Sequence, residues 1–150
     1  MKVKMKKAEV ISLHNACFNL LQETERRTYK FNSALSKTRR FLEAEALAIE
    51  KTREGILEKY TKVGKEVNVK WAKKTGKKIL EYASDPDYTK EVLAANKKFK
   101  KDLDEAQKLM DEETTVEVWA VHPDEVPKLP SIFGDALDII IRNGDLSEAK

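Results

Sequence analysis

Two groups of residues in this sequence carry side chains that could bind a metal or take part in catalysis. In the first group, His14 and Cys17 are three residues apart, a spacing that places both side chains on one face of a helix. A structural zinc site takes four ligands, and only His122 is an obvious further one. We therefore interpret Cys17 as a buried thiol beside a partly buried histidine, and we expect neither a metal site nor a cofactor.

The second group is the loop "HPDEVP", which holds His122, Asp124 and Glu125. Their side chains could exchange protons with a substrate, but no further residues are identifiable that would complete a pocket. Cys17 is expected in mid-helix on an apolar face, where a thiol is usually unreactive. The sequence also contains neither a glycine-flanked nucleophilic serine nor a glycine-rich phosphate loop. It therefore favours a protein that is not an enzyme, with a small enzyme acting at this loop as the last alternative.

A third group is basic. The stretch "VNVKWAKKTGKKIL" contains five lysines, one tryptophan and one glycine, and it has no acidic residue. Exposed lysines can neutralise phosphates and a tryptophan can stack on a base, but the stretch lacks arginine, the residue that makes bidentate base contacts. We expect a solvated turn first and a nucleic-acid contact second. The candidate contact residues are Lys70, Trp71, Lys73, Lys74, Lys77 and Lys78.

Length and composition limit the fold that positions these groups. The chain has 150 residues, of which 37% are charged and only 7% aromatic, a balance that is typical of long solvated helices. The length predicts a single domain over residues 1–150. The net charge of +3 is too small to imply nucleic acid by itself. A lone cysteine excludes an internal disulfide, and the chain has no apolar run of the roughly 18 residues that a membrane span needs.

Two long helices are expected to form the framework. The first runs from about Arg26 to Tyr60, as predicted by residues that alternate steps of four and three: Phe31, Leu35, Thr38, Leu42, Glu45, Ile49, Thr52 and Ile56. The second begins at "SDPDY", where Ser84 or Asp85 caps it, and continues to about Asp111. Because two such helices joined by about two dozen residues fold back on each other, we predict a long antiparallel helical hairpin.

The connecting residues 62–84 interrupt the helical pattern. "EVNVKWA" alternates between apolar and polar residues, and "KKTGKK" contains a glycine turn. This combination predicts a β-hairpin. We therefore expect residues 62–84 to form a basic hairpin inserted at the tip of the helical hairpin.

The remaining segments predict a small sheet and two short helices. "TTVEVWAV", residues 114–121, is β-branched and alternating, and the N-terminal "KVKMK" is the obvious partner strand. Apolar spacing predicts one helix from about Ala8 to Leu21, and "SIFGDALDIII" predicts a short C-terminal helix. The expected fold class is therefore α+β and mostly α: a long antiparallel helical hairpin with a small β-sheet and a short C-terminal helix.

The segments follow one another in a recognisable order. A short strand leads into "AEVISLHNACFNLL", a long helix ends in "EGILEKY", and a "DPDY" helix start precedes "KKFKKDLDEAQKLMDEETTVEVWAV" and "LPSIFGDALDIII". Across nearly the whole chain this pattern resembles a family of short tailed-bacteriophage proteins of uncharacterised function. The resemblance implies no site residues. It implies a phage origin and a location in the cytoplasm of the infected bacterial host or in the virion.

Since no reaction centre is visible, we expect a non-enzymatic protein-binding module, acting in phage particle assembly or as an inhibitor of a host defence or host enzyme. The alternative is a nucleic-acid-binding protein that uses the lysine-rich hairpin. The first long helix also carries a second apolar stripe, at Ala34, Phe41, Ala44 and Ala48. One partner helix cannot cover both stripes, so either the helix from about Ala8 to Leu21 or another subunit must cover the second. We therefore expect a homodimer with Phe41 and Ile140 at its contact, and no association with a membrane.

Overall fold

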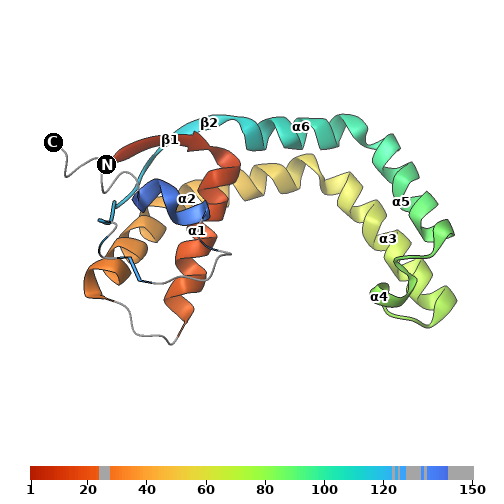
Figure 1. The fold of residues 1–150 in the computed structure, drawn as a ribbon. Helices are drawn as coiled ribbons and strands as arrows, with labels where there is room; N and C mark the ends of the chain where they lie inside the picture. The colour runs from red at the N-terminus through yellow and green to blue at the C-terminus, as the bar shows by residue number, and fades with distance from the viewer. Residues whose placement is uncertain (24–27, 123, 125, 128–132, 134, 142–150) are drawn as a thin grey trace. The chain divides into compact units, whose positions relative to one another are not determined.

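The computed structural model describes residues 1–150 except 24–27, 123, 125, 128–132, 134 and 142–150 (Figure 1). Most of the described chain is helical, and two strands form a small sheet. This confirms the expected fold class, α+β with mostly α-helix. The chain divides into two compact units, one made of residues 1–50 and 110–150 and the other of residues 51–109.

The small sheet lies in the first unit and joins the N-terminal residues to a segment more than 100 residues later in the chain. Strand β1 (Lys2–Lys6) lies beside β2 (Glu113–Glu117) in Figure 1 and pairs with it antiparallel. In this register Val3 lies opposite Val116. The pairing predicted for the N-terminal strand is therefore confirmed. The second strand is shorter than the predicted residues 114–121, because beyond Glu117 the backbone bonds to other partners: the Val118 N–H donates to the Met1 carbonyl.

The core of the first unit lies between the sheet and three helical segments: α1 (Lys7–Gln22), the first part of α2 (Tyr29–Ile56) and residues 135–141. The residues that predicted α2 by their steps of four and three are here called the seam of α2. Its apolar residues are buried as far as Ile49, and its polar residues Thr38 and Glu45 have hydrogen-bond partners. The Thr38 hydroxyl bonds to the backbone of Trp119, and Glu45 accepts from the Thr114 hydroxyl at 3.4 Å. The largest core side chains are Leu13, Leu20, Phe31, Leu35, Leu42, Leu137 and Ile140.

The second unit is built on two antiparallel helices, α3 (Glu58–Thr75) and α5 (Pro86–Lys98), which lie side by side in Figure 1. Near one end of the pair the Tyr60 and Phe99 rings meet edge to face at 6.0 Å. Near the other end the Tyr88 hydroxyl donates to the Asn68 side chain at 2.7 Å. Helix α5 starts as predicted, because the Asp85 carboxylate caps it by accepting from the Asp87 N–H at 2.9 Å.

Two short elements complete this unit. Helix α4 (Ile79–Tyr82) is a single turn between α3 and α5. Helix α6 (Lys100–Asp111) follows α5 after a break at Phe99, whose φ of −103° and ψ of 20° depart from helical values. The predicted single helix from Pro86 to Asp111 is therefore two consecutive helices.

The predicted β-hairpin over residues 62–84 is wrong. Residues up to Thr75 belong to helix α3, and Gly76 ends it in the left-handed conformation, with a φ of 64°. The alternation of Val67 and Val69 suggested a strand, but Tyr60, Gly64, Asn68, Trp71 and Thr75 repeat at steps of four and three. Packing of this face against α5 overrides the local preference of the valines.

Candidate functional site

Trp71 is the structural centre of the lysine-rich stretch that the sequence singles out. Its side chain is only 4% exposed and lies against the rings of Tyr82, at 6.2 Å, and Tyr88, at 5.7 Å. Its indole N–H donates to Oε2 of Glu91 on α5 at 2.6 Å. The tryptophan therefore holds α3, α4 and α5 together, and its ring is not available to stack on a base.

Lys70 is bound to the same carboxylate. Its Nζ lies 2.6 Å from Oε1 of Glu91, so each carboxylate oxygen accepts one hydrogen bond from α3. The hydrogen bonds from Lys70 and Trp71 hold the pKa of Glu91 below its usual value, because both stabilise the ionised form. Lys70 thus connects α3 to α5 through an ion pair within the fold, although part of its side chain remains exposed.

The other four lysines surround the C-terminal end of α3 and are exposed: Lys73, Lys74, Lys77 and Lys78. Lys74 places its ammonium 4.8 Å from the centroid of the Trp71 ring. Thr75 closes the helix, because its hydroxyl donates to the Trp71 carbonyl at 2.6 Å and accepts from the Lys77 N–H at 3.2 Å. Cations at a helix C-terminus are favourable, since the last carbonyls there carry partial negative charge.

Two apolar residues follow these lysines directly and point into solvent. Leu80 is 89% exposed and Ile79 is 48% exposed. Their neighbour Tyr82 on the same helical turn is buried against Trp71. We call the surface made of Lys73, Lys74, Lys77, Lys78, Ile79 and Leu80 the basic tip. The sequence pattern missed the two apolar members, because it assigned them to the returning strand of a hairpin and not to an exposed helical turn.

Formal charge is unevenly divided between the two units. Residues 51–109 contain sixteen lysines and arginines and ten acidic residues, a formal charge of +6, whereas the rest of the chain carries −3. Lysine supplies all but one of the sixteen cations. The basic tip therefore belongs to a unit that attracts anionic partners as a whole.

The two residues expected at a dimer contact lie in different environments. Phe41 on α2 is 45% exposed, and Ala44, Leu47 and Ala48 on the same helix are exposed as well. Ile140 is fully buried in the core of the first unit, where its carbonyl accepts from the Val121 N–H at 3.1 Å. Ile140 therefore has no surface to offer a second copy, and that part of the expected contact is wrong.

The residues considered for a metal site or for acid–base chemistry are dispersed. Cys17 is buried, and burial raises the pKa of its thiol to about 12, so the thiol is protonated at neutral pH. His14 on the same helix lies 3.2 Å from the Asn15 side-chain oxygen. His122 pairs with Asp124 at 3.4 Å, while Glu125 lies outside the described residues. Within the described residues, no group of three or more histidine, cysteine and acidic side chains could hold a metal ion.

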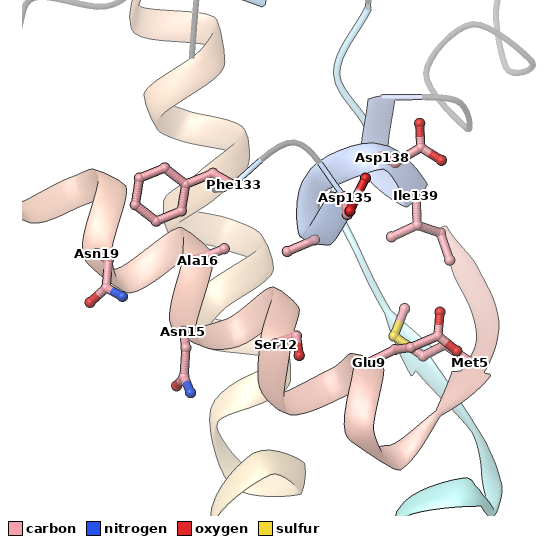
Figure 2. Close-up of a pocket in the computed structure, with 11 residues that line it drawn as sticks. Met5, Glu9, Ser12, Asn15, Ala16, Asn19, Phe133, Asp135, Asp138 and Ile139 are labelled. Atoms are coloured by element: carbon pink, nitrogen blue, oxygen red, sulfur yellow. The ribbon is translucent and has the colours of Figure 1, made fainter. Parts of the chain in front are cut away.

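An acidic hollow lies in the first unit between α1, β1 and residues 133–139. Figure 2 shows its carboxylates, Glu9 on α1 and Asp135 and Asp138 on the C-terminal helical segment, together with the polar side chains of α1. Its volume is about 620 Å³. The Glu9 carboxylate accepts from the Lys6 N–H at 3.1 Å and so helps to cap α1. Among the described lining residues there is no histidine, cysteine or lysine to act as a nucleophile or base beside these carboxylates.

Comparison of the chain with protein-family models, with curated proteins and with solved structures gave no match. The resemblance to short tailed-phage proteins therefore stays a prediction. In the described part of the chain, no helix is both long and apolar enough to cross a membrane.

Proposed function

We propose that the protein is a non-enzymatic binding module whose protein partner docks on the basic tip. The observation that carries this proposal is the exposure of Leu80 beside four exposed lysines. A leucine that is almost fully in water gains free energy when a partner buries it. The surrounding cations favour a partner whose apolar pocket is bordered by carboxylates.

The rigidity of the tip also supports docking. The turn that carries Leu80 is fixed by Tyr82, whose ring packs on Trp71 and whose hydroxyl donates to the Asn68 carbonyl at 3.3 Å. A surface that is already ordered loses little conformational entropy on binding, so more of the contact energy appears as affinity. These contacts of Tyr82 hold the turn from which Leu80 projects, as suits a docking anchor.

The biological setting we propose follows from the resemblance to short tailed-phage proteins. In that setting the protein acts in the cytoplasm of an infected bacterium or in the virion. Its partner is then either a component of the phage particle or a host protein that the phage must inhibit. For either kind of partner we propose the same mode of docking, on Leu80 and the surrounding lysines.

The second candidate function is nucleic-acid binding, which the formal charge of +6 on residues 51–109 favours. In that case the exposed lysines would contact phosphates. Trp71 would contribute no stacking, because its ring is buried and its N–H is already bonded to Glu91. Phosphate contacts of this kind bind without regard to sequence and weaken steeply with salt.

The test is capture of partners from a lysate of infected bacteria by the tagged protein, with and without nuclease, at low and high salt. The variants are Leu80→Ser at the tip and, as a matched control, Leu93→Ser, which changes another exposed leucine on α5. We expect a protein to be captured after nuclease treatment and at high salt by the parent and by Leu93→Ser, but not by Leu80→Ser. Capture that disappears with nuclease, or that Leu80→Ser leaves intact, contradicts the proposal.

A further inference from the structure

A second surface site lies in the first unit, where the start of α2 borders the chain that follows β2. It is a hollow of about 570 Å³, a size that is typical of small-ligand sites. Two aromatic side chains line it, Trp119 and Tyr29, and so do the cations Lys30 and Lys37. His122 and Asp124 also contribute to the lining, and Nδ1 of His122 lies 3.4 Å from the Asp124 carboxylate.

The position of Trp119 is fixed by a buried hydroxyl. Thr38 is the one polar side chain that is fully buried in the described core, and it bonds to the Trp119 backbone. Its hydroxyl accepts from the Trp119 N–H at 2.9 Å and donates to the Trp119 carbonyl at 3.3 Å. The preceding residues Val116 and Val118 are buried, so the alternation of the chain turns the indole outward and leaves it 46% exposed.

The exposed indole is already in contact with a cation. The Lys37 ammonium lies 3.8 Å from the centroid of the Trp119 ring, which is within cation–π range. Tyr29, at the first turn of α2, is almost fully exposed. The hollow therefore presents the Trp119 ring, which can stack on a flat ligand, with Tyr29 also in its lining. Beside the indole lies the Lys37 ammonium, which can pair with an anion more strongly than with the ring.

We propose that this hollow binds a nucleotide unit, with its base stacked on Trp119 and its phosphate paired with Lys37. A nucleotide carries a group that complements each of these residues: its base is a flat π-surface that can stack on the indole, and its phosphate is an anion that can pair with the lysine. In the bound state the base replaces the Lys37 ammonium on the indole face, and the ammonium moves to the phosphate. The same chemistry is offered by a free nucleotide and by a single-stranded nucleic acid. This site lies in a different unit from the basic tip and does not depend on the function proposed for the tip.

The protein contains its own reporter for this test. It has two tryptophans, and Trp71 is buried, so quenching of the intrinsic fluorescence by an added ligand reports on Trp119. Titration with poly-thymidine single strands and with adenosine monophosphate separates the two sources of a nucleotide. Binding of both shows a site that accepts free nucleotides, and binding of the strand alone shows a site for single-stranded nucleic acid. The absence of quenching by both ligands overturns the proposal.

Variants assign the binding to the hollow. With a labelled strand, Trp119→Ala should weaken binding about 5- to 150-fold, the range expected for loss of one base–aromatic stack. Trp119→Phe should retain most of the affinity, because it keeps a ring. Lys37→Gln should lower the slope of log affinity against log salt by about 0.7, the contribution of one phosphate contact.

The control replaces the four lysines of the basic tip with serine. If the strand binds this variant as well as it binds the parent, the hollow is the site. If Trp119→Ala binds normally and the tip variant does not, strand binding belongs to the tip and the proposal is wrong. Because Trp119 is half exposed, its replacement should leave the circular dichroism spectrum unchanged, which separates a lost contact from a lost fold.

Discussion

Trp71 on α3 and Glu91 on α5 are joined by a hydrogen bond of 2.6 Å, in which the indole N–H donates to the carboxylate. The bond crosses the antiparallel pair close to its tip, and Lys70 binds the other oxygen of the same carboxylate. Trp71 is therefore part of the packed interior of the second unit, together with Tyr82 and Tyr88. The four tip lysines and Leu80 are exposed at the surface beside it.

Trp71→Ala should destabilise the second unit. Removal of a buried tryptophan typically costs about 3–5 kcal/mol, and here it also leaves Tyr82 and Tyr88 without their shared contact. Leu80→Ala changes an exposed side chain and should stay within about ±0.5 kcal/mol of the parent. Urea denaturation followed by circular dichroism gives both free energies of unfolding. Equal stability of the two variants would contradict the packing described for Trp71.

The Trp71–Glu91 contact should lose stability in acid. The pKa of Glu91 is lowered in the folded protein from its ordinary value of 4.5. A carboxyl group with a lowered folded-state pKa stabilises the fold above its unfolded-state pKa, and that contribution disappears as the pH falls through the folded-state value. In Glu91→Gln this contribution is absent at every pH. We therefore expect the difference in stability between parent and variant to shrink as the pH falls below 4.5, as measured by thermal unfolding across pH.

Thr38→Val should destabilise the first unit although the two side chains have nearly the same shape. The variant leaves the N–H and carbonyl of Trp119 without the hydroxyl, and an unsatisfied buried polar group costs about 1–3 kcal/mol. Thr38→Ser keeps the hydroxyl and should retain more of the stability than Thr38→Val. Denaturation monitored by tryptophan fluorescence ranks the two variants. If Thr38→Val is the more stable of the two, the hydroxyl does not anchor Trp119.

Phe41→Lys should separate a homodimer into monomers. Phe41 lies on an exposed stripe of α2 with Ala44, Leu47 and Ala48, and burial of such a stripe against a second copy would remove apolar surface from water. Light scattering should give half the mass for the variant, with its helical signal retained. Ile140→Lys should instead unfold the first unit, because Ile140 is fully buried. A monomeric parent at high concentration would refute the dimer.

The parts of the fold that follow from local signals could be predicted from the sequence. The seam of α2 and the Asp85 cap rest on spacing or on a residue whose preference is strong at that position. The pairing of β1 with β2 followed because each strand is locally recognisable and a lone strand needs a partner. The C-terminal end of α3 was not predictable in this way. Val67 and Val69 favour a strand locally, and only the packing of Trp71 against α5 makes them helical.

The candidate sites were predictable only in part. The exposed lysines were identified from composition, but the environment of Trp71 depends on Glu91, which is twenty residues away in the sequence. The sequence pattern predicted Trp119 only as one residue of an alternating strand. The residues next to it in the sequence do not indicate that Thr38 bonds to its backbone or that its ring lines a hollow. The position of Thr38 between Leu35 and Leu42, on the face of the helix that carries the periodic apolar residues, was the one available signal of a buried polar anchor.

Calorimetric titration of the captured protein partner against the parent, Leu80→Ser and the variant with the four tip lysines replaced by serine tests the central claim most directly. A partner that docks on the basic tip buries the leucine and pairs with the lysines. Leu80→Ser should therefore weaken binding at every salt concentration, whereas the lysine variant should weaken it chiefly at low salt, because salt screens exposed charges. Affinities that neither variant changes at any salt concentration would show that the partner docks elsewhere.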